Sequence, residues 1–350
     1  MRTAVHIIAD NISKLEMLRR MVERNFSYTA TLLRRGPQNY SLENVVVAAD
    51  LGVTENVAAL KQSFASAAPS RKRIFLVEQK TRLFAVQAFA LGATDVMFGP
   101  VAEGELCSRL VDHVPPEPAG GEESKGAREA ASGGARAIAS MFSAVVGGRA
   151  IDPGAAMQAA AKMADTIEDD GLSNWLDTVR QHHEGTYQHC LLVTGIAIEF
   201  GLTLGLARAD ITRLYAAAMF HDVGKASISA AILNKPGRLD PEERRLIETH
   251  PAAGYEHLKG TPGISPEVLD AVRHHHEFLD GSGYPDGLDA SGISDVVRML
   301  TISDIFAALI EDRRYKPPMP REQAFEILLG MRGKLEAPLV GAFRKVALGR

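Results

Sequence analysis

The sequence predicts two domains of different fold class, a doubly wound α/β sheet domain followed by an all-α helical bundle. A length of 350 residues suits about two domains of roughly 150 residues each. Residues 1–115 alternate short apolar runs with amphipathic stretches, whereas the pattern from about residue 135 onward is helical throughout. The net charge also changes sign, from +3 over residues 1–115 to −7 over the remainder. These three observations favour two separate modules.

The first domain is expected to alternate strands with helices. Apolar runs predict strands at 4–9, 28–33, 45–49, 73–77 and 95–98, and helical spacing predicts helices at 14–24, 57–64, 81–91 and 102–111. Strands that alternate with helices form a parallel sheet, which places functional residues at the carboxyl ends of its strands. We therefore expect a flavodoxin-like domain over residues 1–114.

A change of composition separates the two domains. Residues 115–134 are rich in Pro, Gly and Glu and are expected to form a flexible linker, because this composition cannot build a core. The helical domain then covers residues 135–350. Helix starts are predicted at Asp152-Pro153, Asp240-Pro241 and Ser265-Pro266, because each pairs an N-cap residue with a proline at the first helical position.

Composition excludes several classes of protein. The chain is 46% hydrophobic and 23% charged, as in soluble globular proteins, and no uncharged apolar run is long enough to span a membrane. The N-terminal residues lack the core of a signal peptide, so a cytoplasmic protein is expected. Two cysteines, Cys107 and Cys190, cannot form a disulfide framework, and the net charge of −4 does not indicate nucleic-acid binding.

Histidines and aspartates recur on, or at the ends of, apolar helices in the second domain: His189, His221, Asp222, His250, His275, His276 and Asp304. A single histidine on an apolar face is usually an ordinary core residue. Five histidines and two carboxylates, however, would be costly to bury without a compensating cation. Mixed imidazole and carboxylate ligands suit Fe, Mn, Ni or Zn, and a pair of such ions can clamp a phosphoryl group.

Two motifs carry a resemblance to a known family. Residues 221–225 read His-Asp-Val-Gly-Lys, which resembles the HDxGK motif of the HD superfamily of metal-dependent phosphohydrolases. Residues 275–285, HHEFLDGSGYP, resemble the signature of the HD-GYP family, and the match runs over about 180–350. The resemblance implies an HD-type bundle and hydrolysis of cyclic di-GMP to linear pGpG by a hydroxide that two metal ions activate; further hydrolysis to GMP stays open.

The resemblance also implies roles for individual residues. His189, His221 and Asp304 would bind one ion, His250, His275 and His276 would bind the other, and Asp222 would bridge the two. Asp222 and Lys225 would be catalytic, with Lys225, Tyr284, Arg313 and Lys316 contacting substrate. There are alternatives to these substrate contacts. Lys225 would be an ordinary solvated lysine, Tyr284 would have a structural role under the loop, and Arg313 and Lys316 would lie at a solvated helix end. A third metal is not expected, since Gly185 stands where some relatives have Glu.

The first domain resembles the receiver domain of two-component signalling, in a degenerate form. Asp50 stands at the phosphoacceptor position and Asp10 follows the first strand, but Glu78 and Gly99 stand where a hydroxyl and a lysine are needed. We expect a docking or dimerisation platform, and a homo-oligomer formed through this domain. The alternative is an α/β domain with no signalling role.

Three functions follow in order of preference. The first is a cyclic di-GMP phosphodiesterase that requires two ions, iron or manganese before nickel or zinc. The second is a regulatory module with little turnover, which binds a cyclic dinucleotide or signalling partner proteins. The third is a phosphodiesterase for another cyclic dinucleotide.

Overall fold

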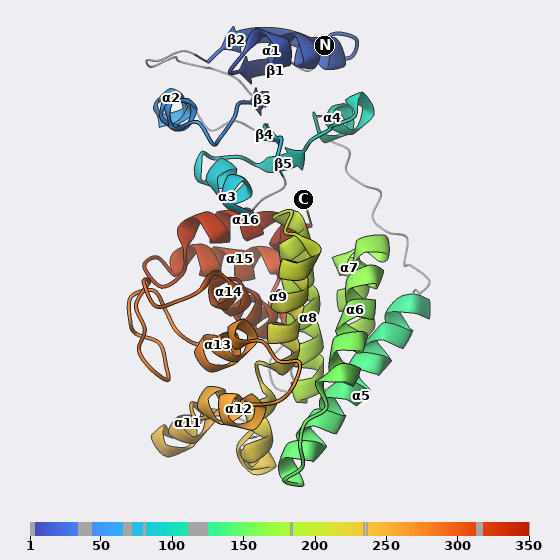
Figure 1. Cartoon of the computed structure of the whole chain (residues 1–350), viewed down its shortest axis with the longest axis vertical. Helices are drawn as coiled ribbons and strands as arrows, with labels where there is room; N and C mark the ends of the chain where they lie inside the picture. The colour runs from blue at the N-terminus through green and yellow to red at the C-terminus, as the bar shows by residue number, and fades with distance from the viewer. Residues whose placement is uncertain are drawn as a thin grey trace. The chain divides into compact units, whose positions relative to one another are not determined.

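The chain forms two compact units, one made of Met1–Gly120 with Leu204–Ala207 and a second made of Gly121–Thr203 and Arg208–Arg350. The structure is a computed structural model that describes residues 4–33, 44–65, 72–79, 82–110, 125–182, 185–233, 235, 237–312 and 318–349. The first unit is built on a sheet and the second is helical (Figure 1). The prediction of an α/β domain followed by an all-α domain is therefore confirmed.

The first unit contains a five-stranded parallel sheet with the strand order β2-β1-β3-β4-β5. Its elements are β1 (Ala4–Ala9), α1 (Ile12–Val22), β2 (Ser27–Leu32), β3 (Asn44–Ala48), α2 (Thr54–Ala65), β4 (Lys72–Val77), α3 (Arg82–Ala90), β5 (Asp95–Phe98) and α4 (Glu103–Leu110). This order occurs in one common class of doubly wound proteins. All the predicted strands and helices are present, with ends within a few residues of the predicted ones.

Helices cover both faces of this sheet. Val45 and Val47 of β3 point to the face where Leu60 of α2 packs. Val46, between them, points to the opposite face with Leu18 of α1. All the residues of β3 are buried, because a parallel sheet covered on both sides buries its strands completely.

The second unit consists of helices around a buried apolar core. They are α5 (Lys125–Val146), α6 (Pro153–Asp170), α7 (Leu172–His182), α8 (Gly185–Thr203), α9 (Arg208–Phe220), the 3₁₀ helix η1 (Val223–Ser227), α10 (Ala230–Leu233), α11 (Pro241–Ile247), α12 (His250–Leu258), α13 (Pro266–His274), α14 (Asp295–Ile310), α15 (Arg321–Gly330) and α16 (Ala337–Leu348). Within the described residues, no helix is both long and apolar enough to cross a membrane. The predicted N-caps Asp152, Asp240 and Ser265 each accept a main-chain N–H in the first turn.

The predicted linker is wrong in its second half. Residues 125–134 are the first part of α5, and Ala127, Ala130, Ala131 and Gly134 are buried on one side of that helix. Gly134 lies so close to Met163 and Leu191 that a Cβ atom would collide with both. Small residues that look like linker composition thus permit close helix packing. The rest of the predicted linker, residues 115–124, lies outside the described residues.

A second correction concerns His250, which was expected to end the helix that starts at Pro241. That helix, α11, ends at Ile247, and His250 begins α12. The cause is Pro251, which favours the first turn of a new helix and disrupts the last turn of a preceding one. His250 is consequently held at a helix start.

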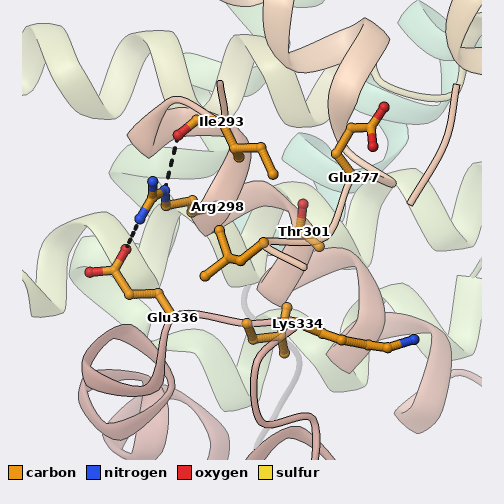
Figure 2. A pocket seen from close by; sticks show the side chains of 8 residues that line it. Glu277, Ile293, Arg298, Thr301, Lys334 and Glu336 are labelled. Carbon is orange, nitrogen blue, oxygen red and sulfur yellow. Dashed lines mark hydrogen bonds and ion pairs between the residues drawn. The ribbon is translucent and has the colours of Figure 1, made fainter. Parts of the chain in front are cut away.

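The second unit also has a very small pocket of about 10 Å³, lined by Glu277, Leu279, Ile293, Arg298, Thr301, Lys334, Leu335 and Glu336 (Figure 2). Known ligand pockets are larger, about 300–1,000 Å³. The guanidinium group of Arg298 donates to the main-chain oxygen of Ile293 at 3.0 Å and pairs with Glu336 at 2.8 Å. Since its principal charge is already paired, the pocket supports the surrounding chain and offers no clear site for a ligand.

Candidate metal centre

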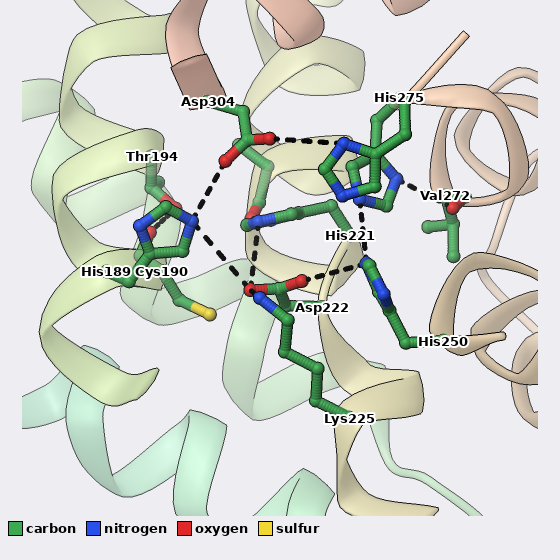
Figure 3. Close-up of polar contacts among 12 residues, drawn as sticks. His189, Cys190, Thr194, His221, Asp222, Lys225, His250, Val272, His275 and Asp304 are labelled. Atoms are coloured by element: carbon green, nitrogen blue, oxygen red, sulfur yellow. Dashed lines mark hydrogen bonds and ion pairs between the residues drawn. The ribbon is translucent and has the colours of Figure 1, made fainter. Parts of the chain in front are cut away.

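The seven histidines and aspartates predicted as ligands come together in the second unit (Figure 3). His189 lies on α8, and His221 and Asp222 follow the end of α9. His250 begins α12, His275 and His276 directly follow α13, and Asp304 lies on α14. Their donor atoms form the two expected groups, one of His189, His221 and Asp304 and another of His250, His275 and His276, each within 4.8 Å.

Three of these histidines are oriented in the same way. The Nδ1 atoms of His221, His250 and His275 lie 2.7, 2.7 and 2.9 Å from the main-chain oxygen three residues earlier. A carbonyl oxygen only accepts hydrogen bonds, so each Nδ1 carries the proton. Each ring therefore turns its Nε2 atom toward the centre.

The orientation of these rings leaves acceptors facing one another. His250 Nε2 and His275 Nε2 are 3.1 Å apart, and in neutral rings with the proton on Nδ1 both of these atoms carry lone pairs. His221 Nε2 is buried and makes no hydrogen bond within the described residues. Burial, followed by the charge of neighbouring histidines, holds the pKa of His275 well below its usual range. Facing acceptors of this kind fit a bound cation, because a cation is the partner they lack.

Asp222 lies between the two groups. Its Oδ2 atom is 3.3 Å from His221 Nε2, and its Oδ1 atom is 3.2 Å from His250 Nε2. Lys225 Nζ donates to Oδ2 at 2.6 Å. Burial alone would raise the pKa of Asp222, but His221 and Lys225 hold it well below its usual range. The carboxylate is therefore ionised, with one oxygen toward each group.

Asp304 joins the two groups from the opposite side. One of its oxygens lies 2.9 Å from His189 Nε2 and the other 3.7 Å from His276 Nδ1. Contact with His189 outweighs burial and lowers the pKa of Asp304 far below its usual range. The pKa of His276 falls to about 3, mainly because the ring is buried.

The glycine of the first motif is required by close packing. A Cβ atom on Gly224 would collide with the main-chain oxygen of His250, where η1 crosses the start of α12. This contact sets the position of His250 relative to Asp222. Glycine is the residue that permits such an approach of two backbones.

The loop after His276 is held by a buried carboxylate. Glu277 is 2% exposed and accepts the main-chain N–H groups of Asp286, Gly287 and Leu288 at 2.7, 2.9 and 3.1 Å. Gly283 packs so closely on the backbone of Glu277 that a Cβ atom would collide with it. The loop is thereby fixed against the segment that carries His275 and His276.

The structure describes two of the four residues that are predicted to contact substrate, Lys225 and Tyr284. Lys225 reaches Asp222, with 21% of its side chain exposed. The ring of Tyr284 lies 4.8 Å from that of His276 with an angle of 31° between the planes, and burial raises the pKa of its hydroxyl. Tyr284 therefore packs on a candidate ligand, while part of it stays accessible. Arg313 and Lys316 lie outside the described residues.

Sequence reasoning missed two buried residues at this centre. Glu311 lies with its Oε2 atom 3.5 Å from His189 Nδ1, and Cys190 lies within 4.8 Å of donor atoms of His221 and Asp222. The sequence signal for Glu311 was its position seven residues after Asp304, because residues with this separation lie on the same side of a helix. Cys190 directly follows His189 and gave no signal. His274, which is not in the predicted ligand set, contacts Asp270 and Asp286.

The strand ends of the first unit also hold an unpredicted residue. Lys14 Nζ lies 3.2 Å from Asp10 and 2.9 Å from Glu78. The main-chain N–H of Asp50 donates to Asp10 at 2.6 Å. Glu78 was expected to add uncompensated negative charge, but Lys14 neutralises it. The spacing of Asp10 and Lys14, one helical turn, was the available signal.

Residues 170–337 match the family described as HD domain. The chain is 31% identical over 210 residues to a cyclic di-GMP phosphodiesterase of Pseudomonas aeruginosa. The aligned residues make up 60% of this chain and 51% of the relative. The chain is 40% identical over 125 residues to a 3'3'-cGAMP-specific phosphodiesterase of Vibrio cholerae, covering 36% of this chain and 27% of the relative. The chain thus spans about half the length of these relatives or less.

Among solved structures, an HDG"Y"P protein of Bdellovibrio bacteriovorus is similar in fold, with a TM-score of 0.51 and 16% identity. The similarity covers 62% of this chain and 70% of that one. The family match, the relatives and the long motif agree. Residues 170–337 of the helical unit are therefore similar to the HD domain family and to curated cyclic di-GMP phosphodiesterases.

Proposed function

We propose that this protein is a metal-dependent phosphodiesterase that hydrolyses cyclic di-GMP to linear pGpG. The observation that carries the proposal is the pair of Nε2 atoms of His250 and His275, which face each other at 3.1 Å with their Nδ1 protons bound elsewhere. With both rings neutral, this arrangement fits a bound cation. The relatives named as cyclic di-GMP phosphodiesterases support the choice of substrate.

We propose two ions per chain, of iron or manganese, with nickel or zinc as alternatives. One would be held by His189, His221 and Asp304 and the other by His250, His275 and His276. Asp222 would bridge them, since its two oxygens face the two groups. Ions at these positions would supply an activated water and neutralise charge on the phosphoryl oxygens.

The remaining residues would bind and orient the substrate. Lys225 is positioned to donate to a phosphate oxygen, since its ammonium group already contacts a carboxylate oxygen at the centre. Tyr284 presents the accessible part of its ring beside His276, where a guanine base can stack. Arg313 and Lys316 are proposed to bind phosphate on the basis of their sequence positions.

The test is a turnover assay on protein loaded with Fe²⁺ or Mn²⁺, with cyclic di-GMP, 3'3'-cGAMP and cyclic di-AMP compared at equal concentration. We expect cyclic di-GMP to be cleaved fastest, with pGpG as the first product. Preference for 3'3'-cGAMP would change the substrate and keep the enzyme class, while binding without cleavage of any of them would favour the regulatory module. Elemental analysis should give two ions per chain, and three fully occupied ions would contradict the ligand assignment.

We further propose that the first unit serves as a docking or dimerisation platform with a degenerate receiver-like site. The contact of Lys14 with Asp10 supports the degenerate character of this site, because it occupies an acidic group that a receiver needs for a metal ion. The predicted homo-oligomer would form through this unit.

A further inference from the structure

His189 differs from the other histidines of the metal centre in what lies behind its ring. His221, His250 and His275 each donate Nδ1–H to a neutral main-chain oxygen of their own helix or turn. His189 instead turns Nδ1 toward Glu311, with 3.5 Å between Nδ1 and Oε2, while its Nε2 atom faces Asp304 at 2.9 Å. One histidine of this group thus has a carboxylate at its outer nitrogen.

Glu311 is buried and is fixed by its backbone. Its side chain is 3% exposed, and its main-chain N–H closes the last turn of α14 by donating to Ala307. Glu311 is the C-cap that follows α14, about two helical turns beyond Asp304, so both residues lie on the same side of this helix. The helix that supplies one candidate ligand therefore also supplies the group behind another.

A carboxylate at this position has two physical consequences. The Nδ1 and Oε2 atoms do not form a hydrogen bond at this distance, but the negative charge favours a proton on Nδ1, which leaves the lone pair on Nε2 for a metal ion. It also makes the ring a stronger electron donor than a ring bonded to a neutral carbonyl oxygen. Both effects act only on the ion held by His189, His221 and Asp304.

We propose that Glu311 is a positioning residue that orients and polarises His189, so that the ion of the His189 group binds more tightly than the ion of the His250 group. This inference rests on the proposed two-ion site, and it assigns to Glu311 a role in making the two positions unequal.

The experiment is a calorimetric titration of metal-free, full-length protein with Mn²⁺. Wild type should bind two ions with different affinities. Glu311→Gln keeps the shape and removes the charge, and should weaken the tighter ion about 10- to 100-fold. Glu311→Ala should weaken it at least as much. Asp312→Asn is the matched control, since it removes one exposed carboxylate at the next position and should change neither affinity.

A double-mutant cycle separates positioning from a general structural effect. If Glu311 acts through His189, Glu311→Gln should cause no further loss of Mn²⁺ affinity in a His189→Ala background. An equal further loss there overturns the proposal. Melting curves of the metal-free variants verify that each is folded. If Glu311→Ala does not fold, Glu311→Gln still tests the proposal, because glutamine has the same shape as glutamate.

Failure of this inference is distinct from failure of the proposed function. Wild-type protein that binds no Mn²⁺ and cleaves no cyclic dinucleotide contradicts the two-ion enzyme, and the role of Glu311 with it. If wild-type protein binds two ions and both Glu311 variants bind them with the wild-type affinities, only the role of Glu311 is overturned.

Discussion

The carboxylate of Glu277 accepts the main-chain N–H of Asp286 at 2.7 Å, and so connects two segments nine residues apart in the chain. Two further N–H groups of the same loop point at this buried carboxylate. Glu277 thus takes the place of a ladder of main-chain hydrogen bonds that an irregular loop cannot make.

Replacement of Glu277 by alanine should lower the free energy of unfolding of the helical unit by about 2–4 kcal/mol, because buried N–H groups lose a charged acceptor. Glu277→Gln should cost less, since it keeps one acceptor oxygen. Thermal and denaturant unfolding measure both, with Glu326→Ala on an exposed face of α15 as the control. Equal stability of Glu277→Ala and the control would show that the loop is held by other contacts.

Asp222→Ala should abolish hydrolysis of cyclic di-GMP. The variant removes the carboxylate between the two groups of ligands, so that two bound ions would face each other without an anion between them. Turnover and metal content should be measured on the same sample, beside Asp169→Ala as an exposed control. Full turnover with both ions still bound would refute a bridging role for Asp222.

Gly224→Ala should destabilise the protein by about 1–3 kcal/mol, the usual cost of forcing extra atoms into a packed interior. It should also weaken metal binding at the His250 group, because the new methyl group pushes on the backbone of His250. Gly341→Ala is the opposite control. That glycine lies within α16 with open space around it, so alanine should add roughly 0.5–1 kcal/mol of stability. Loss of stability in both variants alike would rule out the specific contact.

Asp50 should not accept a phosphoryl group from acetyl phosphate. Lys14 is bound to Asp10 and Glu78, and no hydroxyl stands at the position of Glu78 to assist the transfer. Labelling with acetyl phosphate and Mg²⁺ measures this directly. Rapid labelling of wild type that disappears in Asp50→Asn would prove the expectation incorrect.

Removal of residues 1–124 should convert the protein to a monomer if the first unit drives association. The cut belongs before Lys125, because a deletion to residue 134 would remove the buried start of α5 and damage the helical unit. Light scattering and turnover are the measurements. An unchanged oligomer would contradict the docking role, and a monomer with unchanged turnover would show association that does not regulate catalysis.

The sequence by itself determined the fold classes, the strands of the sheet, the N-caps and the identity of the histidine and aspartate set. These features depend on local patterns: apolar runs, capping residues before prolines, and motifs whose members lie within a few residues of one another. Local patterns also misled. Small residues at 125–134 read as a linker, since nothing in the segment itself shows that it packs against Met163 and Leu191.

Only the tertiary structure decided how the site is arranged. His189 and Asp304 lie 115 residues apart, and their contact depends on how α8 and α14 pack. The facing Nε2 atoms of His250 and His275, and the place of Glu311 behind His189, depend on ring orientation as well. Ring orientation follows from which carbonyl or carboxylate lies beside each Nδ1, and packing between distant segments sets that neighbour. The sequence therefore named the residues that can hold a metal, while the fold determined which of their atoms face the centre.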